Sequence, residues 1–278
     1  MSLTRSQDGD TSVHHAETIL AAADEHRHIQ PLTEREGSFG LPEAYRVTAE
    51  VRRLREARRE RVVGRKIGFT NTTIWGEYGV GAPIWGYVYD TTRHSLVDVS
   101  GPVALTPFVE PRIEPEIVLG LARATEVGMD ERALLACVGW VALGFEVVQS
   151  LFPGWRFRAP DTVAALGLHG ALYVGEPAPV TPENAAGWSA ALRRFDVQLH
   201  RDGAVVETGR ASNVLQDGPL AALRHLVEVL SADPSSPPLA AGEVITTGTL
   251  TNAHPISAGQ TWSTVNTGLP LAEIRLAF

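Results

Sequence analysis

Two glutamates, Glu114 and Glu116, stand two positions apart just before the apolar run 117–121. The run predicts a buried β-strand, and in a strand residues i and i+2 point to the same face. Two neighbouring carboxylates repel each other and resist desolvation unless a cation lies between them. Carboxylate oxygens are the usual ligands of Mg²⁺, Mn²⁺ and Ca²⁺, so the pair is typical of a metal site. The spacing alone leaves a second interpretation equally open, in which both side chains point into water.

Two further charged residues lie in stretches that predict core strands. Glu146 stands between apolar neighbours in the run 144–148. A buried acid of this kind normally has a cationic partner. Lys66 lies in the strand predicted over 62–70. Such a lysine either extends its ammonium group to the surface, which the position by itself favours, or serves as a cation for an anionic substrate.

Composition narrows the class of protein. A chain of 278 residues fits one large domain or a domain with an appendage. The net charge of -8 argues against a nucleic-acid binder, which needs a basic face. The single cysteine, Cys137, excludes a disulfide framework within the chain. No apolar stretch reaches the roughly 20 residues that span a bilayer. The polar N-terminus has no signal-peptide pattern. We therefore expect a cytoplasmic protein that binds neither nucleic acid nor membrane.

The order of predicted elements indicates the fold class. Helices are predicted over 13–26, 42–59, 131–143 and 219–230. Strands are predicted over 62–70, 103–109, 117–121, 144–148, 168–175, 194–200, 204–209, 244–249, 262–265 and 272–278. Because helices and strands do not alternate regularly, we expect an α+β fold with a mixed β-sandwich or β-roll core. Residues 1–60 would form a helical N-terminal region, and residues 61–278 a metal-binding β-roll catalytic domain. No nucleotide-binding motif is present.

Four motifs occur in an order that resembles a known family. They are Gly-Arg-Lys-Ile-Gly-Phe-Thr at 64–70, Glu-Pro-Arg-Ile-Glu-Pro-Glu-Ile at 110–117, Gly-Phe-Glu-Val-Val at 144–148 and Gly-Glu-Val-Ile-Thr-Thr-Gly at 242–248. In these motifs the chain resembles the 2-keto-4-pentenoate hydratase / 4-oxalocrotonate decarboxylase branch of the fumarylacetoacetate hydrolase superfamily, over nearly its whole length. The resemblance implies the mixed β-roll of that family and a homo-oligomer.

The same resemblance implies roles for individual residues. Glu114, Glu116 and Glu146 would together hold one divalent metal, Mg²⁺ or Mn²⁺. Lys66 would lie beside the 2-oxo acid end of a small-molecule substrate. A metal in this place acts as a Lewis acid for the enolate of a 2-oxo acid, and Lys66 adds a second positive charge. The complete carboxylate set argues against a non-catalytic binding protein, because three buried carboxylates without a metal would be destabilising.

The chain departs from the pattern of the family after the third glutamate. Hydratases of the family commonly carry an Ala-Asp-Asn-Ala-Ser type stretch there, and its polar Asn and Ser positions are Leu166 and Leu168 here. His169 is the preferred replacement for the missing acid/base group and His254 the second, although each is also explained as a structural histidine. The first expectation is a lyase that hydrates a 2-hydroxy-2,4-dienoate in aromatic-compound catabolism. Decarboxylation of a 4-oxalocrotonate-type 2-oxo diacid, which needs no positioned water, and C–C hydrolysis of an acylpyruvate stay open.

Overall fold

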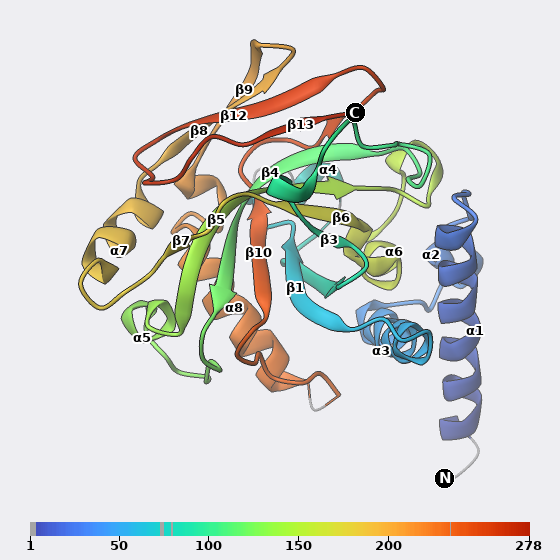
Figure 1. Ribbon diagram of the computed structural model, residues 1–278. Coiled ribbons are helices and arrows are strands. Elements are labelled where there is room, and N and C mark those ends of the chain that lie inside the picture. The colour runs from blue at the N-terminus through green and yellow to red at the C-terminus, as the bar shows by residue number, and fades with distance from the viewer. Residues whose placement is uncertain (1–3, 73–74, 79, 234) are drawn as a thin grey trace.

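A strongly curled sheet forms the centre of the molecule (Figure 1). The computed structural model describes residues 4–72, 75–78, 80–233 and 235–278, and within these ranges the sheet has nine strands. Their order across the sheet is β2 (Ile84–Tyr89), β1 (Val62–Gly68), β10 (Val244–Thr249), β4 (Arg112–Leu121), β5 (Val138–Val148), β6 (His169–Val174) and β3 (Arg93–Ser95), with β11 (His254–Pro255) beside β4 and β7 (Ala178–Pro179) beside β5. Parallel pairs (β1 with β10, β3 with β6) combine with antiparallel ones, which confirms the predicted mixed sheet of an α+β fold.

A smaller sheet packs at the upper end of the curled sheet as drawn in Figure 1. Its four strands among the described residues are β13 (Arg275–Ala277), β12 (Thr261–Thr267), β8 (Asp196–Arg201) and β9 (Ala204–Arg210), in this order. The hairpin between β8 and β9 turns at Asp202 and Gly203, whose φ angles of 53° and 83° are left-handed. The Asp-Gly pair predicts this turn, because both residue types tolerate a positive φ.

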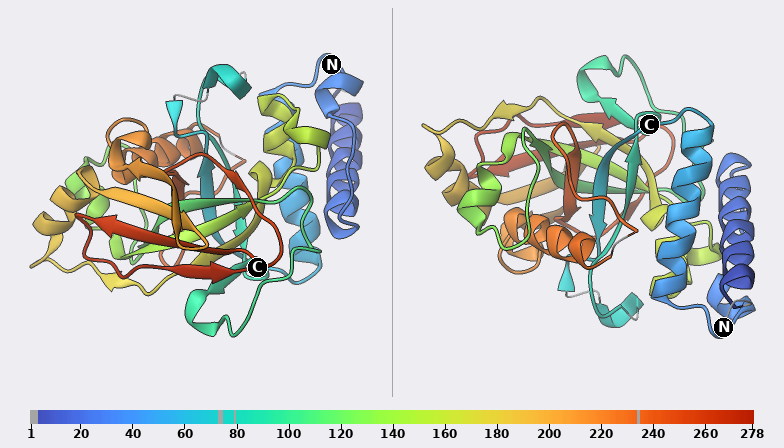
Figure 2. Two further views of the ribbon diagram at one scale, coloured as in Figure 1. Left: turned by 90° about the horizontal axis from the view of Figure 1, so that it is seen from above. Right: turned by 90° about the horizontal axis from the view of Figure 1, so that it is seen from below.

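The N-terminal helices lie along one flank of the curled sheet. They are α1 (Thr4–Asp24), α2 (Leu32–Arg35) and α3 (Leu41–Ala57). In both views of Figure 2, α1 and α3 run side by side. The two helices share a hydrophobic cluster with Val163 and Ala164. The division of the chain at residue 60 stays a prediction.

The remaining helices are short, apart from α8. They are α4 (Trp75–Tyr78), α5 (Glu131–Leu135), α6 (Ala159–Ala164), α7 (Ala185–Arg193) and α8 (Pro219–Ala232). Short 3-10 helices are η2 (Leu96–Asp98), η3 (Pro153–Trp155), η4 (Leu166–Leu168) and η5 (Ala211–Asn213). Across the described part of the chain, no helix combines the length and the apolar character that a bilayer crossing requires.

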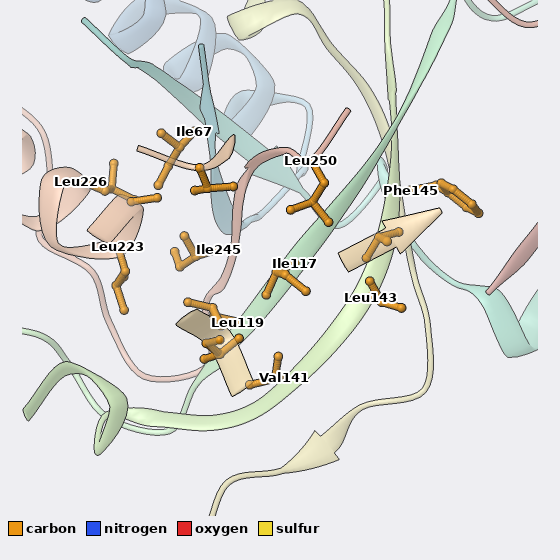
Figure 3. Close-up of a cluster of buried hydrophobic side chains, with 14 of the residues drawn as sticks. Ile67, Ile117, Leu119, Val141, Leu143, Phe145, Leu223, Leu226, Ile245 and Leu250 are labelled. Carbon is orange, nitrogen blue, oxygen red and sulfur yellow. The ribbon is translucent and has the colours of Figure 1, made fainter. Parts of the chain in front are cut away.

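The main hydrophobic core lies between α8 and one face of the curled sheet (Figure 3). Ile117 and Leu119 of β4 belong to it, together with Leu143 of β5 and Leu223 of α8. Each such side chain contributes about 1.5–3 kcal/mol when it is fully buried. Since side chains alternate along a strand, the residues between them on β4 point to the opposite face. The core therefore fixes which face of β4 carries its charged residues.

Two predicted elements are wrong. The helix expected over 131–143 ends at Leu135, and β5 begins at Val138. The apolar spacing fits a helix face, but the segment from Val138 onward hydrogen-bonds to β4, and this long-range pairing overrides local propensity. No strand forms over 103–109, where the chain is irregular and contains a turn at residues 106–107. Pro107 within it has no N–H group to donate to a neighbouring strand.

A buried carboxylate connects the N-terminal region to α6. Asp161, which is fully buried, accepts hydrogen bonds from the backbone N–H of Thr33 at 2.9 Å and from the Thr33 hydroxyl at 2.7 Å. It also accepts the backbone N–H of Arg158 at 2.9 Å. One side chain thus satisfies three donors and joins segments that are far apart in the sequence.

We predict that Asp161→Ala lowers the free energy of unfolding by about 2–4 kcal/mol, because it leaves buried donors without a partner. Chemical denaturation measures this change. The matched control is Asp130→Ala, which removes the exposed N-cap of α5 and its single 2.8 Å bond from Ala133. That loss should be about 1 kcal/mol. Equal losses in the two variants would contradict the role given to Asp161.

Candidate metal and substrate site

The pairing of β4 with β5 brings three carboxylates together. Glu114 lies directly opposite Glu146 in the antiparallel register, and Glu116 lies opposite Gly144. All three glutamates share the face of the sheet that points away from the α8 core. One carboxylate oxygen from each lies within 4.8 Å of the other two. Glu116 and Glu146 are fully buried, and Glu114, which lines the adjoining cavity, is partly exposed.

The donor set fits a divalent cation. Oε2 of Glu116 accepts the backbone N–H of Gly248 at 2.8 Å, but Oε1 of the same carboxylate is buried and has no hydrogen-bond partner among the described residues. An unpaired buried carboxylate oxygen is costly. Three carboxylates supply the hard oxygen ligands that Mg²⁺ and Mn²⁺ take. A cation bound between them would therefore satisfy the oxygen that the protein leaves unpaired.

Lys66 supplies a positive charge next to this cluster. It is the only lysine in the sequence, and its side chain is buried. Its Nζ lies 3.2 Å from Oε2 of Glu146 and donates a 3.0 Å hydrogen bond to the carbonyl oxygen of Gly167. Its ammonium group therefore points into the protein. The surface-directed alternative, which the sequence position by itself favours, is wrong.

The pKa values show how unevenly the site distributes charge. Burial raises the pKa of Glu114 to about 7, although Lys66 opposes the rise. Burial and the neighbouring carboxylates raise the pKa of Glu116 well above its usual value. Burial also acts to raise the pKa of Glu146, but Lys66 and His169 outweigh it and lower this pKa to about 2. Burial acts to lower the pKa of Lys66, but the three glutamates outweigh it and raise it. Lys66 thus remains charged and pairs chiefly with Glu146.

A strained turn holds the carbonyl group that binds Lys66. Leu166, Gly167 and Leu168 in η4 have φ angles of 61°, 63° and 64°. A left-handed backbone at a residue with a bulky side chain costs of order 1–3 kcal/mol. Such strain is typical of functional sites, where the surrounding structure enforces it. Here it directs the carbonyl oxygen of Gly167 to the ammonium group.

A cavity of about 250 Å³ adjoins the cluster. Its polar lining residues are Lys66, Arg112, Glu114, Thr249 and Asn252. Its apolar and glycine lining residues are Gly68, Phe69, Ile84, Val148, Trp155, Phe157, Gly167, Leu168 and Ala253. The space is suited to a small organic anion with one end at the charged cluster and an apolar body.

His169 lies behind the cluster and not in this cavity. Its Nδ1 is 2.7 Å from Oε1 of Glu146, and its Nε2 is 2.9 Å from Oγ1 of Thr92. The ring lines a second cavity of about 500 Å³ instead. His254, the second candidate, pairs with Glu207 at 2.6 Å and lies beside the wall of the first cavity without lining it. His169 therefore contacts Glu146 and does not reach the first cavity. Its role in catalysis stays a prediction.

Comparisons with known proteins identify the family. No family model matches the chain. A 2-hydroxyhexa-2,4-dienoate hydratase of Comamonas testosteroni is 30% identical over 252 residues, which cover 90% of this chain and 91% of that protein. The chain belongs to the 2-keto-4-pentenoate hydratase / 4-oxalocrotonate decarboxylase branch of the fumarylacetoacetate hydrolase superfamily. It is therefore a hydro-lyase or a carboxy-lyase of this branch.

Two decarboxylases support the same branch. A 4-oxalocrotonate decarboxylase of Pseudomonas sp is 31% identical over 218 residues, which cover 77% of this chain and 80% of that protein. The structure of 4-oxalocrotonate decarboxylase from Pseudomonas putida G7, complexed with magnesium and adipate, matches with a TM-score of 0.87 and 26% identity. That match covers 100% of this chain and 99% of the other, so the expected fold of the family is confirmed.

Several residues around this candidate site were missed from the sequence. Arg112 lies on the same face of β4 as Glu114, and the i, i+2 rule that paired the glutamates could have included it. Gly248 ends one of the motifs quoted for the family, yet its contact with Glu116 appears only in the structure. Trp155 has no sequence signal, because the loop around it comes near β4 only through tertiary packing.

The first prediction for this site concerns the three glutamates as candidate metal ligands. Glu116→Gln should abolish retention of Mg²⁺, because it removes a charge and an oxygen ligand from the cluster. Titration calorimetry measures the binding directly. Mg²⁺ at a concentration of 100 times its Kd should stabilise the wild-type protein by about 2.7 kcal/mol, and the variant should show no such gain. The control Glu126→Gln changes an exposed glutamate and should bind Mg²⁺ normally. Normal binding by the Glu116 variant would refute the ligand assignment.

A second prediction concerns the backbone that holds Glu116. Gly248 has a φ of 97°, and a Cβ atom on it would lie 1.8 Å from the Thr70 hydroxyl oxygen. Gly248→Ala should therefore move the N–H group away from Glu116, and we expect Mg²⁺ affinity to fall at least about 10-fold. Gly242 has a similar φ of 89° with nothing near its Cβ position, so Gly242→Ala is the matched control. Calorimetry measures the Mg²⁺ affinity of both variants. A loss in Gly248→Ala alone is due to the steric clash, and an equal loss in both variants would contradict this explanation.

Proposed function

We propose that this protein is a metal-dependent lyase that acts on a small 2-oxo acid. The observation that carries the proposal is the Lys66 ammonium group, held beside three clustered glutamates at the end of the 250 Å³ cavity. A carboxylate next to a keto group is a natural ligand for a divalent metal, and its negative charge suits the lysine. The membership in the hydratase and decarboxylase branch agrees with this substrate class.

Glu114, Glu116 and Glu146 would hold the metal, with Mg²⁺ or Mn²⁺ as the candidates. When bound, such a metal supplies Lewis-acid polarisation of the carboxylate and keto oxygens of the substrate. The related decarboxylase contains magnesium in its solved structure. Gly248 and His169 would keep two of the ligands in place through their hydrogen bonds to Glu116 and Glu146.

Lys66 would stabilise the negative charge that develops on the substrate. Both hydration and decarboxylation of these substrates pass through an enolate-like species, in which charge accumulates on the former keto oxygen. A fixed ammonium group inside a largely apolar cavity stabilises this charge more than water does.

Hydration of a 2-hydroxy-2,4-dienoate is the first candidate reaction. The hydratase relative matches over 90% of the chain. Decarboxylation of a 2-oxo diacid is the second candidate, and a specific observation favours it. Leu168, at a position where family hydratases commonly carry a polar residue, lines the cavity. Decarboxylation needs no positioned water, so an apolar wall suits it. C–C hydrolysis needs a water-activating base, and His169 does not line this cavity.

Other expectations from the sequence remain proposals. They are the homo-oligomeric state, the cytoplasmic location and the boundary between a helical N-terminal region of residues 1–60 and a catalytic region of residues 61–278. Gel filtration with light scattering measures the oligomeric state directly.

The function is tested by assaying the Mg²⁺-loaded protein on 2-hydroxypenta-2,4-dienoate and on 4-oxalocrotonate side by side. We expect turnover of at least one of them. Lys66→Met should lower kcat at least about 100-fold, because it removes the cation that stabilises the developing charge. Arg59→Met, which removes an exposed cation elsewhere, should leave kcat unchanged. Turnover of neither compound by the wild-type protein, or full activity of the Lys66 variant, would contradict the proposal.

A further inference from the structure

The cavity contains a second cation besides Lys66. Arg112 lines it and lies two residues before Glu114 on β4, so both side chains leave the same face of the sheet. Two residues along a strand span about 6.5 Å. Along β4, Arg112 therefore lies about 6.5 Å beyond Glu114, in the direction away from Glu116. The cavity has a cationic group near the metal ligands and another farther along the same strand.

Arg112 is held in place by an aromatic ring. Its guanidinium carbon lies 4.1 Å from the centre of the Trp155 ring, a cation–π geometry. The Trp155 Nε1–H donates to the carbonyl oxygen of Glu110 at 3.0 Å, which fixes the ring. The Glu110 carboxylate in turn accepts the backbone N–H of Gly154 at 3.0 Å. The loop that carries Trp155 is thus hydrogen-bonded to Glu110, just before β4, and its ring lies against the guanidinium group of Arg112.

The guanidinium group has unused binding capacity. Among the residues that the structure describes, no carboxylate forms an ion pair with Arg112, although its charge acts on Glu114 and lowers the pKa of that carboxyl. An arginine presents several N–H donors in a planar fork that matches a carboxylate. A cation at the wall of a cavity that forms no ion pair with a carboxylate of the described residues is a suitable partner for a carboxylate on the ligand.

We propose that Arg112 binds a second, distal carboxylate and thereby sets the specificity of the site for 2-oxo diacids. This inference rests on the proposed function, since it assumes that the 2-oxo acid end lies at Lys66 and the three glutamates. A six-carbon diacid that is anchored there extends along β4 toward Arg112. A monoacid of the same length places an apolar end beside the guanidinium group and leaves the cation unpaired.

An alternative role for Arg112 is distinguishable from this one. Arg112 could bind the carboxylate next to the keto group, together with Lys66. In that case every 2-oxo acid would lose affinity when the arginine is removed, whatever its far end carries. If Arg112 binds the distal carboxylate, only diacids lose affinity. Two ligands of equal length that differ at the far end alone separate the two roles.

The experiment measures binding of 2-oxoadipate and 2-oxohexanoate to the Mg²⁺-loaded protein by calorimetry. These saturated compounds need no turnover, so binding is read without catalysis. Arg112→Gln should weaken 2-oxoadipate about 10- to 100-fold, since a charge-assisted, forked hydrogen bond is lost. Binding of 2-oxohexanoate should stay unchanged. Arg112→Lys should give an intermediate loss for 2-oxoadipate, because it keeps the charge but not the fork.

Arg156→Gln is the matched control. Arg156 is exposed, adjoins Trp155 and does not line the cavity, so its variant removes the same charge from the neighbourhood without removing the contact. It should leave the affinity for both ligands unchanged. Thermal melts of all variants show whether the fold is preserved.

The outcomes separate this inference from the function on which it rests. Equal losses for both ligands, or no loss for either, would overturn the role of Arg112 while the proposed function stands. A loss of 2-oxoadipate affinity in Arg156→Gln as large as that in Arg112→Gln would also overturn it, because a general field effect would then explain the result. If the wild-type protein binds neither 2-oxo acid in Mg²⁺, the proposed function fails and this inference fails with it.

Discussion

The antiparallel register between β4 and β5 places Glu146 directly opposite Glu114, and the other features of the site follow from that placement. Three carboxylates on one buried face repel one another, and removing them from water adds to the cost. Burial of the main hydrophobic core on the opposite face of the same strands offsets this cost. Shifting the register by one residue would expose Ile117 and Leu119 and bury the charges where the core now lies. The packing of the core therefore enforces the geometry of the charged cluster.

The surroundings of the cluster compensate its charge only in part. Lys66 and His169 both contact Glu146, and Gly248 contacts Glu116. One oxygen of Glu116 stays unpaired among the described residues. A site of this kind is less stable than an apolar core of the same volume, and such arrangements persist where function requires them. The left-handed turn at Leu166 and Leu168 adds strain at the same place.

Neighbouring parts of the fold act on the site through a few contacts. The N-terminal helices connect to α6 through Asp161, and α6 leads into the strained turn that binds Lys66. The small sheet reaches the cavity wall through Glu207, which accepts hydrogen bonds from the backbone and side chain of Asn252. The two additions to the curled sheet thus each contact a segment that lines the cavity.

Local patterns in the sequence predicted much of the fold. The α+β class, the mixed sheet, the Asp202 turn and the strand at 244–249 follow from periodicity and turn residues, which depend on near neighbours in the chain. The helix predicted over 131–143 failed because the segment from Val138 pairs with β4, and no local pattern records that partner. The strand predicted over 103–109 failed because β-propensity does not provide a neighbour to pair with.

For the site, the sequence by itself determined which residues carry charge and that Glu114 and Glu116 share a face, because the two-residue period of a strand is local. The resemblance to the family implied that Glu146 joins them and that Lys66 faces the substrate, and the tertiary structure shows the contacts that bring these residues together. Only the tertiary structure decided that His169 contacts Glu146 and lies outside the cavity. It also brought Trp155 to Arg112 across a long stretch of chain. These contacts join residues that are far apart in the sequence, and strand register and side-chain packing fix them only when the whole sheet is formed.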